Sequence, residues 1–272
     1  WDKFVRRLAD AKYRVYVTGS NAKMLSKEVA TTLGGRFFIY DAYPYSFKEY
    51  LAAQQVELKE HWEYDTIQRS EVKRHLNEYF YYGGLPEILS FKNKRAMLSS
   101  LYQKIYLGDI CARNNIKNDR VLNILIKKMA ESVKQPLSYN RLKNVIVATG
   151  SPISVPTTID YVDYTSDSWL ILPMENEVGK LTEKEMQKKY YFVDNGLLNL
   201  FLMNSETSLL ENMVAVELCR RFGKKNVFFL NSEKEIDFIV PDEKLAFQVS
   251  YSIKEESTYN REVPPLTKYA KA

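Results

Sequence analysis

The stretch EIDFIVPDEKLAFQVSYS, residues 235–252, alternates acidic and apolar residues, turns, and then resumes an extended apolar pattern. Successive side chains of a strand point to opposite faces, so the acids Glu235 and Asp237 share one face and the apolar residues 236, 238 and 240 share the other. Residues 241–244, PDEK, have turn chemistry because proline fixes φ and aspartate tolerates turn conformations. The sequence therefore predicts a β-hairpin. Its predicted pairs are Val240 with Leu245, Asp237 with Gln248, and Glu235 with Ser250.

This polar face resembles the site of nucleases of the PD-(D/E)xK type. In such a site an aspartate and a glutamate or glutamine hold a divalent cation through oxygen, and a lysine two residues further along steadies the attacking water. Here QVS, residues 248–250, stands where ExK is expected, so Ser250 brings no positive charge. The resemblance implies Asp237 and Gln248 as metal ligands. A Glu-x-Asp alternation is also typical of a strand face exposed to solvent, and this second interpretation stays open.

The segment LLENMVAVELCRRF, residues 209–222, has the apolar spacing of a helix, and Glu217 lies beside its packing face. The nuclease fold keeps its remaining acid on a helix ahead of the aspartate strand. The predicted catalytic set is therefore Glu217, Asp237 and Gln248, complete except for the lysine. A lysine from elsewhere could replace it, because only the position of the ammonium group matters. The candidates are Lys224, Lys225 and Lys254.

Composition excludes several classes of protein. The chain of 272 residues is long enough for two or three small domains, and 45% of its residues are hydrophobic. No apolar run is long enough to span a membrane. Two cysteines and two histidines exclude a disulfide framework and a zinc site by their count. We expect a cytoplasmic protein without a membrane partner. The net charge of +5 permits contact with DNA without requiring it.

Six short segments, in order along the chain, resemble prokaryotic AAA+ ATP-binding proteins with a DUF4143 carboxyl-terminal region, the AAA_14/DUF4143 type. In that family TGSNA follows a strand similar to sensor 1, which senses the γ-phosphate, and the arginine of LGGR acts toward a neighbouring nucleotide. The resemblance assigns these nucleotide-sensing roles to Ser20, Asn21 and Arg36. The six segments are VYVTGSNAKML, LGGRFFIYDAYPYSFKEYL, EYFYYGGLPEIL, IYLGDI, KKYYFVDNGLLNLF and LLENMVAVEL.

The chain departs from this family at its beginning. It contains no G-x-x-x-x-G-K-[ST] loop and no apolar strand ending in Asp-Glu, which would hold the phosphates and Mg²⁺. We therefore expect a protein truncated before sensor 1. ATP and Mg²⁺ would be cofactors of its full-length parent, an ATPase, and this chain alone would be inactive.

The predicted fold class is a multidomain α/β protein, and the resemblance supports a winged-helix module within it. Helices are expected over 121–133, 138–150 and 155–167, followed by strands over 169–174 and 188–194. No lysine or arginine occurs from Val145 to Val178, so the third helix is unsuited to a DNA groove and is better suited to packing or to protein contact. The expected domains are the end of the AAA+ core (1–46), a helical lid and connector (47–120), the winged-helix module (121–203) and a restriction-nuclease-like domain (204–272).

Three functions follow from these observations. The first is a fragment of an AAA+ ATP-binding protein whose degenerate nuclease-like domain serves binding or regulation. The second is a Mg²⁺-dependent DNA nuclease with a migrated lysine, and the third is a protein-interaction scaffold without enzymatic activity. DNA and a second copy of the chain are the candidate partners, since AAA+ proteins commonly form rings.

Overall fold

The computed structural model describes residues 2–19, 37–203, 205–231 and 235–269. Helices and short strands are mixed along the chain, in agreement with the predicted α/β class. The helices are α1 (Asp2–Asp10), α3 (Phe47–Ala53), α4 (Thr66–Tyr82), α5 (Lys94–Gln103), α6 (Asp119–Glu131), α7 (Tyr139–Ala148), α8 (Val155–Asp167), α9 (Leu181–Met186), α10 (Asn195–Asn199), α11 (Glu206–Phe222) and α12 (Glu256–Tyr269). The strands are β1 (Leu137–Ser138), β2 (Ile171–Met174), β3 (Gln187–Phe192), β4 (Phe228–Asn231), β5 (Glu235–Val240) and β6 (Leu245–Phe247).

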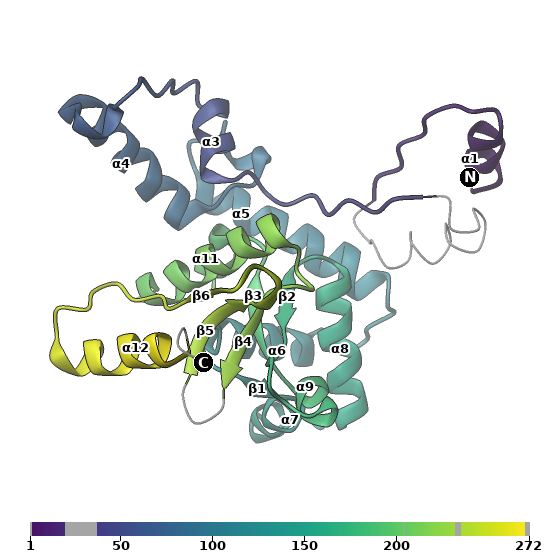
Figure 1. Ribbon diagram of the computed structural model, residues 1–272. Helices are drawn as coiled ribbons and strands as arrows, with labels where there is room; N and C mark the ends of the chain where they lie inside the picture. The colour runs from purple at the N-terminus through teal and green to yellow at the C-terminus, as the bar shows by residue number, and fades with distance from the viewer. Residues whose placement is uncertain (1, 20–36, 204, 232–234, 270–272) are drawn as a thin grey trace.

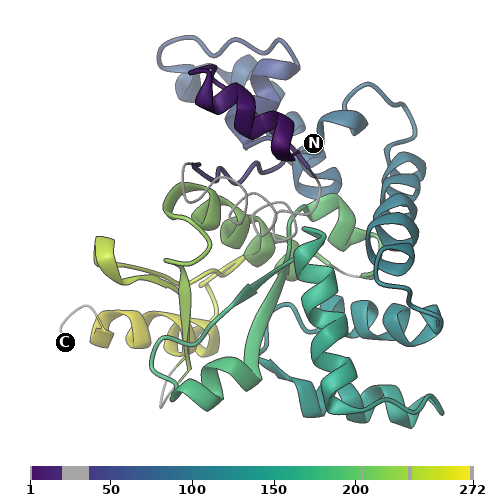
Figure 2. The same ribbon diagram turned by 90° about the vertical axis from the view of Figure 1, so that its right-hand side faces the viewer.

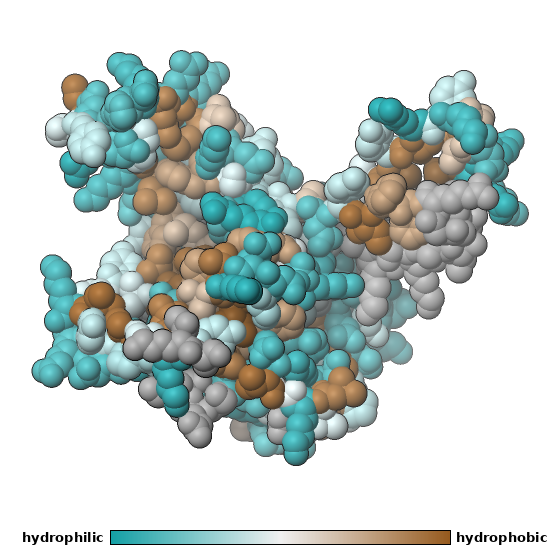
Figure 3. Space-filling view, viewed as in Figure 1, coloured by the Kyte–Doolittle hydropathy of each residue, from teal (hydrophilic) through white to brown (hydrophobic). Residues whose placement is uncertain are grey.

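The amino-terminal arm, α1 with the extended residues near it, projects from the rest of the molecule (Figure 1). The strand expected directly before the segment TGSNA does not form, and Tyr16 is 88% exposed. A strand needs a neighbour for its N–H and C=O groups, and the described residues place none beside it. Figure 3 shows hydrophobic residues at the surface of this arm. Ser20, Asn21 and Arg36 lie outside the described residues.

Helices follow from residue 47 onward, as the sequence predicts. Helix α3 begins with a capping box, in which Ser46 and Glu49 bond each other's backbone N–H groups. Helix α4 ends at Tyr82, where Gly83 takes a φ of 77° that glycine adopts without steric cost. A π-helical segment, Lys104–Ala112, continues α5. Helices α6, α7 and α8 lie within two residues of the predicted ranges at each end, and α8 matches its range.

The six strands of the described ranges form two antiparallel sheets, of order β1-β3-β2 and β4-β5-β6. The chain leaving β2 runs parallel to β4, where the Phe229 N–H donates to the carbonyl of Glu175 at 3.0 Å and the Glu177 N–H donates to the carbonyl of Phe229 at 2.9 Å. The two sheets are therefore joined at this edge. In Figure 2 the teal helices α7 and α8 and the yellow helix α12 lie on opposite sides of the strands.

The predicted hairpin is present in strands β5 and β6. Val240 pairs with Leu245, and residues 241–243 form a 3₁₀ turn that ends at Lys244 in the left-handed region. The predicted division of faces is wrong, because three residues of β5 span the length of two residues of β4 and form a β-bulge. Ile236 and Ile239 consequently share one apolar cluster beside α12, whereas Phe238 joins the main core on the other side.

Two glycine-containing motifs allow α4 to pack closely against the segment after β3. A Cβ atom on Gly83 would lie 2.0 Å from Asp194 Oδ1, and one on Gly196 would lie 2.2 Å from the carbonyl oxygen of Tyr82. Asp194 is buried there and accepts the N–H groups of Gly84 at 2.7 Å and Gly196 at 2.8 Å. The motifs YYGGLPE and VDNGL thus require glycine because the Asp194 side chain packs against Gly83 and the backbone of Tyr82 packs against Gly196.

Candidate functional site

A fully buried lysine stands at the centre of the candidate site. Lys189 comes from β3, and its Nζ atom lies 3.3 Å from Glu211 Oε1, 3.1 Å from Glu235 Oε1 and 3.7 Å from Asp237 Oδ1. Its ammonium group is also 5.6 Å from the centre of the Phe229 ring. Burial alone would lower the pKa of Lys189, but the three carboxylates outweigh burial and raise the pKa above its ordinary value. The lysine is therefore a permanent internal cation.

The bulge in β5 turns Asp237 toward this lysine. The Asp237 side chain is 10% exposed, so the solvent-facing interpretation is wrong for Asp237, whereas the Glu235 side chain is 48% exposed. Its Oδ2 atom accepts the Val249 N–H at 2.8 Å. Burial and the neighbouring Glu211 raise the pKa of Asp237 to about 7, although Lys189 and the Val249 N–H act in the opposite direction. Asp237 consequently changes its protonation state close to neutral pH.

Helix α11 packs against β3 and bonds it through the adjacent residues Glu211 and Asn212, both buried. Glu211 Oε1 accepts the Tyr191 hydroxyl at 2.8 Å in addition to its contact with Lys189. Asn212 bonds both backbone groups of Phe192, accepting its N–H at 2.7 Å and donating to its carbonyl at 3.0 Å. Because the Glu211 carboxylate and the Asn212 amide both bond residues of β3, the helix is fixed in register against that strand.

Gln248 lies beside Asp237 as predicted, but its contacts are with the protein. Its Oε1 atom accepts the Asp237 N–H at 3.2 Å, and its Nε2 group donates to Glu262 of α12. Glu262 is buried and also pairs with Arg261 at 2.8 Å. The amide therefore links β5 to α12, and its carbonyl oxygen already has a donor.

The structure places the other predicted residues elsewhere. Glu217 pairs with Arg220 and, at 2.6 Å, with Arg221 on the outer part of α11, away from the Lys189 contacts. Lys224 pairs with Asp41 at 3.3 Å, and Lys225 and Lys254 are exposed in loops. The helix acid beside Asp237 is Glu211 instead of Glu217, and the lysine is Lys189. The sequence contains a signal for Lys189, because strand alternation puts Lys189 and Tyr191 on one face of an otherwise apolar segment.

In the arrangement that the structure shows, the described residues do not fit a divalent cation. They contain no group of three or more histidine, cysteine, aspartate or glutamate side chains arranged to hold a metal ion. The carboxylates that could supply oxygen ligands converge on the ammonium group of Lys189 instead. An ammonium group cannot share that position with a metal ion, since two cations at such separations repel each other.

Comparison with known proteins places these elements in a wider context. Residues 1–51 match the family described as "AAA domain", and residues 73–208 match the family described as "Domain of unknown function (DUF8612)". The resemblance to AAA-type proteins is thereby supported, whereas the second matching family is DUF8612 and the predicted DUF4143 region is not shown. No helix in the described ranges is both long and apolar enough to cross a membrane.

Two curated relatives cover nearly all of the chain. An uncharacterized protein of Methanocaldococcus jannaschii is 32% identical over the whole chain, and an uncharacterized protein of Haemophilus influenzae is 32% identical over 94% of it. The chain spans 62% and 64% of the length of these relatives. No solved structure matches it. The match to DUF8612, residues 73–208, covers half of the chain, and the protein therefore belongs to the DUF8612 family.

Proposed function

We propose that the chain is part of an AAA-type ATP-binding protein and that its carboxyl-terminal region is a degenerate nuclease-like module used for binding or regulation. In this proposal residues 1–46 belong to the ATPase core, with Ser20, Asn21 and Arg36 sensing a nucleotide. ATP and Mg²⁺ are cofactors of the longer cytoplasmic protein. The match to an AAA domain over residues 1–51 supports this assignment.

The single observation that carries the proposal is the position of Lys189. Helix α11, strands β4, β5 and β6, and helix α12 follow one another as one acidic helix, three antiparallel strands and a second helix. Glu211 on the helix and Asp237 on the middle strand are the acids that a nuclease of this type would direct at a cation. Here the cation is the ammonium group of Lys189, 3.3 Å and 3.7 Å from them. The cation of the site is therefore part of the chain itself.

The region from α6 to β3 supports a winged-helix assignment that serves protein contact. Three helices, α6, α7 and α8, precede strands β2 and β3, and the short β1 completes a sheet of order β1-β3-β2. Helix α8 would be the recognition helix, yet it carries Asp160, Asp163 and Asp167 and no basic residue. An acidic surface repels DNA phosphates, so we assign this helix to a protein partner.

A second candidate is a Mg²⁺-dependent nuclease in which Lys189 is the migrated lysine. The observation in its favour is the 3.7 Å distance between Lys189 Nζ and Asp237 Oδ1. In an active enzyme of this kind the lysine would steady the attacking water beside a bound cation. This candidate requires Glu211 and Asp237 to exchange their contacts with Lys189 for contacts with Mg²⁺.

Isothermal titration of Mn²⁺, followed by a DNA cleavage assay in the same buffer, tests the proposal. The protein, Asp237→Ala and the matched control Asp242→Ala are compared, the control removing an exposed acid from the turn that follows the same strand. We expect no Mn²⁺ binding and no cleavage by any of the three. Binding to the protein and to Asp242→Ala that is lost in Asp237→Ala would refute the proposal in favour of the nuclease.

A further inference from the structure

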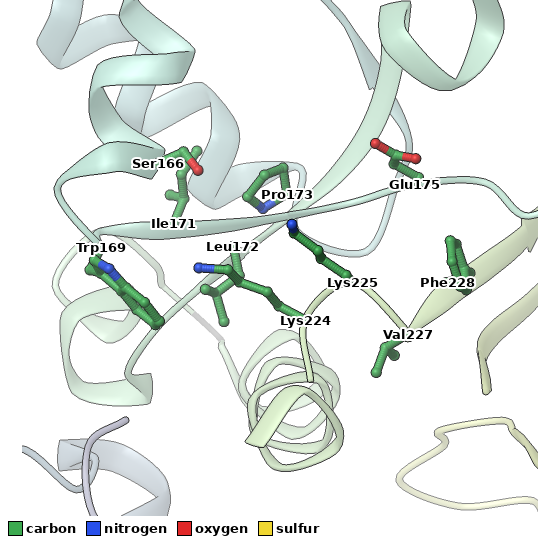
Figure 4. Close-up of a pocket in the computed structure, with 10 residues that line it drawn as sticks. All are labelled: Ser166, Trp169, Ile171, Leu172, Pro173, Glu175, Lys224, Lys225, Val227 and Phe228. Carbon is green, nitrogen blue, oxygen red and sulfur yellow. The ribbon is translucent and has the colours of Figure 1, made fainter. Parts of the chain in front are cut away.

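A groove separate from the Lys189 cluster lies between β2 and the loop that joins α11 to β4. Its volume is about 440 Å³, within the range of small-molecule sites. Figure 4 shows the side chains of Lys224 and Lys225 extending from the loop over β2, with Trp169 at one end and Glu175 and Phe228 at the other. Two long cations on a short loop thus reach across the floor of the groove.

The groove carries an excess of positive charge. Lys225 is exposed and has no ion-pair partner among the described residues, whereas Lys224 pairs with Asp41 at 3.3 Å. Glu175 is the acid of the lining, and it is engaged by Lys188 at 3.2 Å. At least one ammonium group is therefore available to an anion, and the second is held by a carboxylate that an anion could displace.

Ring side chains accompany the two cations. Trp169, Pro173 and Phe228 line the groove and are each half-buried, so part of each ring faces it. Trp169 has a φ of 59°, a left-handed conformation that is uncommon and strained for a bulky residue. Its ring is held by Lys224, 4.0 Å from the ring centre, and by the edge of Tyr43 at 5.5 Å. The surrounding contacts keep Trp169 at the rim despite this strain.

We propose that this groove binds a phosphate group attached to a planar base, the chemistry of a nucleotide. Lysine ammonium groups pair with phosphate oxygens, and aromatic rings provide stacking surfaces that accept any base. Lys225 binds the phosphate directly, and Lys224 joins it by leaving Asp41, while the base stacks on Phe228 with Pro173 beside it. A free mononucleotide and one nucleotide of a single strand present the same groups to the groove.

Isothermal titration without Mg²⁺ tests the proposal with three probes: AMP, a ten-nucleotide thymidine strand and inorganic phosphate. The variants are Lys225→Ala, Lys224→Ala and the matched control Lys127→Ala, an exposed lysine on α6. Loss of one charged hydrogen bond weakens binding about tenfold, so each groove variant should bind about tenfold more weakly and the control should bind like the protein. Asp41→Asn frees Lys224 and should bind more tightly.

The outcomes separate the two sources of the ligand and can overturn the proposal. Tighter binding of the strand than of AMP, with a salt dependence that decreases in Lys225→Ala, identifies a single strand. Equal binding of AMP and the strand identifies a mononucleotide. Three outcomes contradict the proposal of a nucleotide site. The first is equal affinity of Lys225→Ala and Lys127→Ala, and the second is no binding of AMP or the strand at millimolar concentration. The third is that inorganic phosphate binds as tightly as AMP. The groove shares no residue with the Lys189 cluster, so the metal titration does not decide this proposal.

Discussion

Replacing Lys189 by methionine tests whether the internal cation holds the two sheets together. Methionine fills a similar volume, so the substitution removes charge and leaves little cavity. It also leaves Glu211 and Asp237, whose side chains are 5% and 10% exposed, without their cation. Breaking a buried ion pair by removing one partner costs about 3–5 kcal/mol. With a slope of about 3 kcal/mol per molar urea, the midpoint of unfolding should fall by about 1–1.7 M.

Urea unfolding followed by circular dichroism at neutral pH measures this effect, with Lys188→Met as the matched control. Lys188 is the adjacent lysine of β3, but its partners Glu175 and Glu185 are 39% and 61% exposed, so its loss should cost at most about 1 kcal/mol. The double variant Lys189→Met with Glu211→Gln removes a stranded charge and should recover part of the loss. If Lys189→Met and Lys188→Met unfold within 1 kcal/mol of each other, the internal cation does not stabilise this junction.

Three further predictions concern other parts of the fold. Gly196→Ala places a Cβ against the carbonyl of Tyr82 and should lower the free energy of unfolding by more than about 3 kcal/mol. Gly108→Ala, whose Cβ would have nothing within 4 Å, should raise it by about 0.5–1 kcal/mol, and thermal unfolding compares the two variants. The pKa of Asp237 is raised from its ordinary value to about 7, so its contribution to stability is fully present at acid pH and is lost as pH rises toward 7. Asp237→Asn should therefore flatten the decline in urea midpoint between about pH 4 and 7, and an unchanged slope would contradict the assignment. Ser46→Ala removes the capping box of α3 and should cost about 1 kcal/mol, measured as local amide exchange in that helix.

The hairpin shows which structural features a local sequence pattern predicts and which it does not. The turn chemistry of residues 241–244 predicted the pairing of Val240 with Leu245, and the structure confirms it. The alternation rule then placed Phe238 opposite Asp237, but both residues lie in the bulge, and Phe238 packs 5.5 Å from the Tyr191 ring in the main core. A bulge depends on how β4 pairs with β5, which a pattern within one strand does not contain.

The identity of the site residues depended on contacts between distant segments. Glu211 and Glu217 lie on one helix, and the apolar spacing of that helix favoured Glu217 as the acid beside the packing face. The structure buries Glu211 because Tyr191 and Lys189 of β3 satisfy it, and it leaves Glu217 to two arginines. A lysine that is 22 residues from Glu211 along the chain, and further from Asp237, could be assigned only once β3 was placed against α11.

The source of the cation decides how the carboxyl-terminal sheet responds to its surroundings. A metal ion is in exchange with solvent, so a site that depends on one loses stability when the ion is removed. Lys189 is covalently part of β3 and contacts Glu211 of α11 together with Glu235 and Asp237 of β5, so its charge cannot dissociate from the fold. The junction of the two sheets should therefore unfold at the same urea concentration with and without a chelator, whereas a metal-dependent nuclease site would not. What varies instead is the protonation of Asp237, whose pKa of about 7 makes the junction responsive to pH where a metal site would be responsive to Mg²⁺.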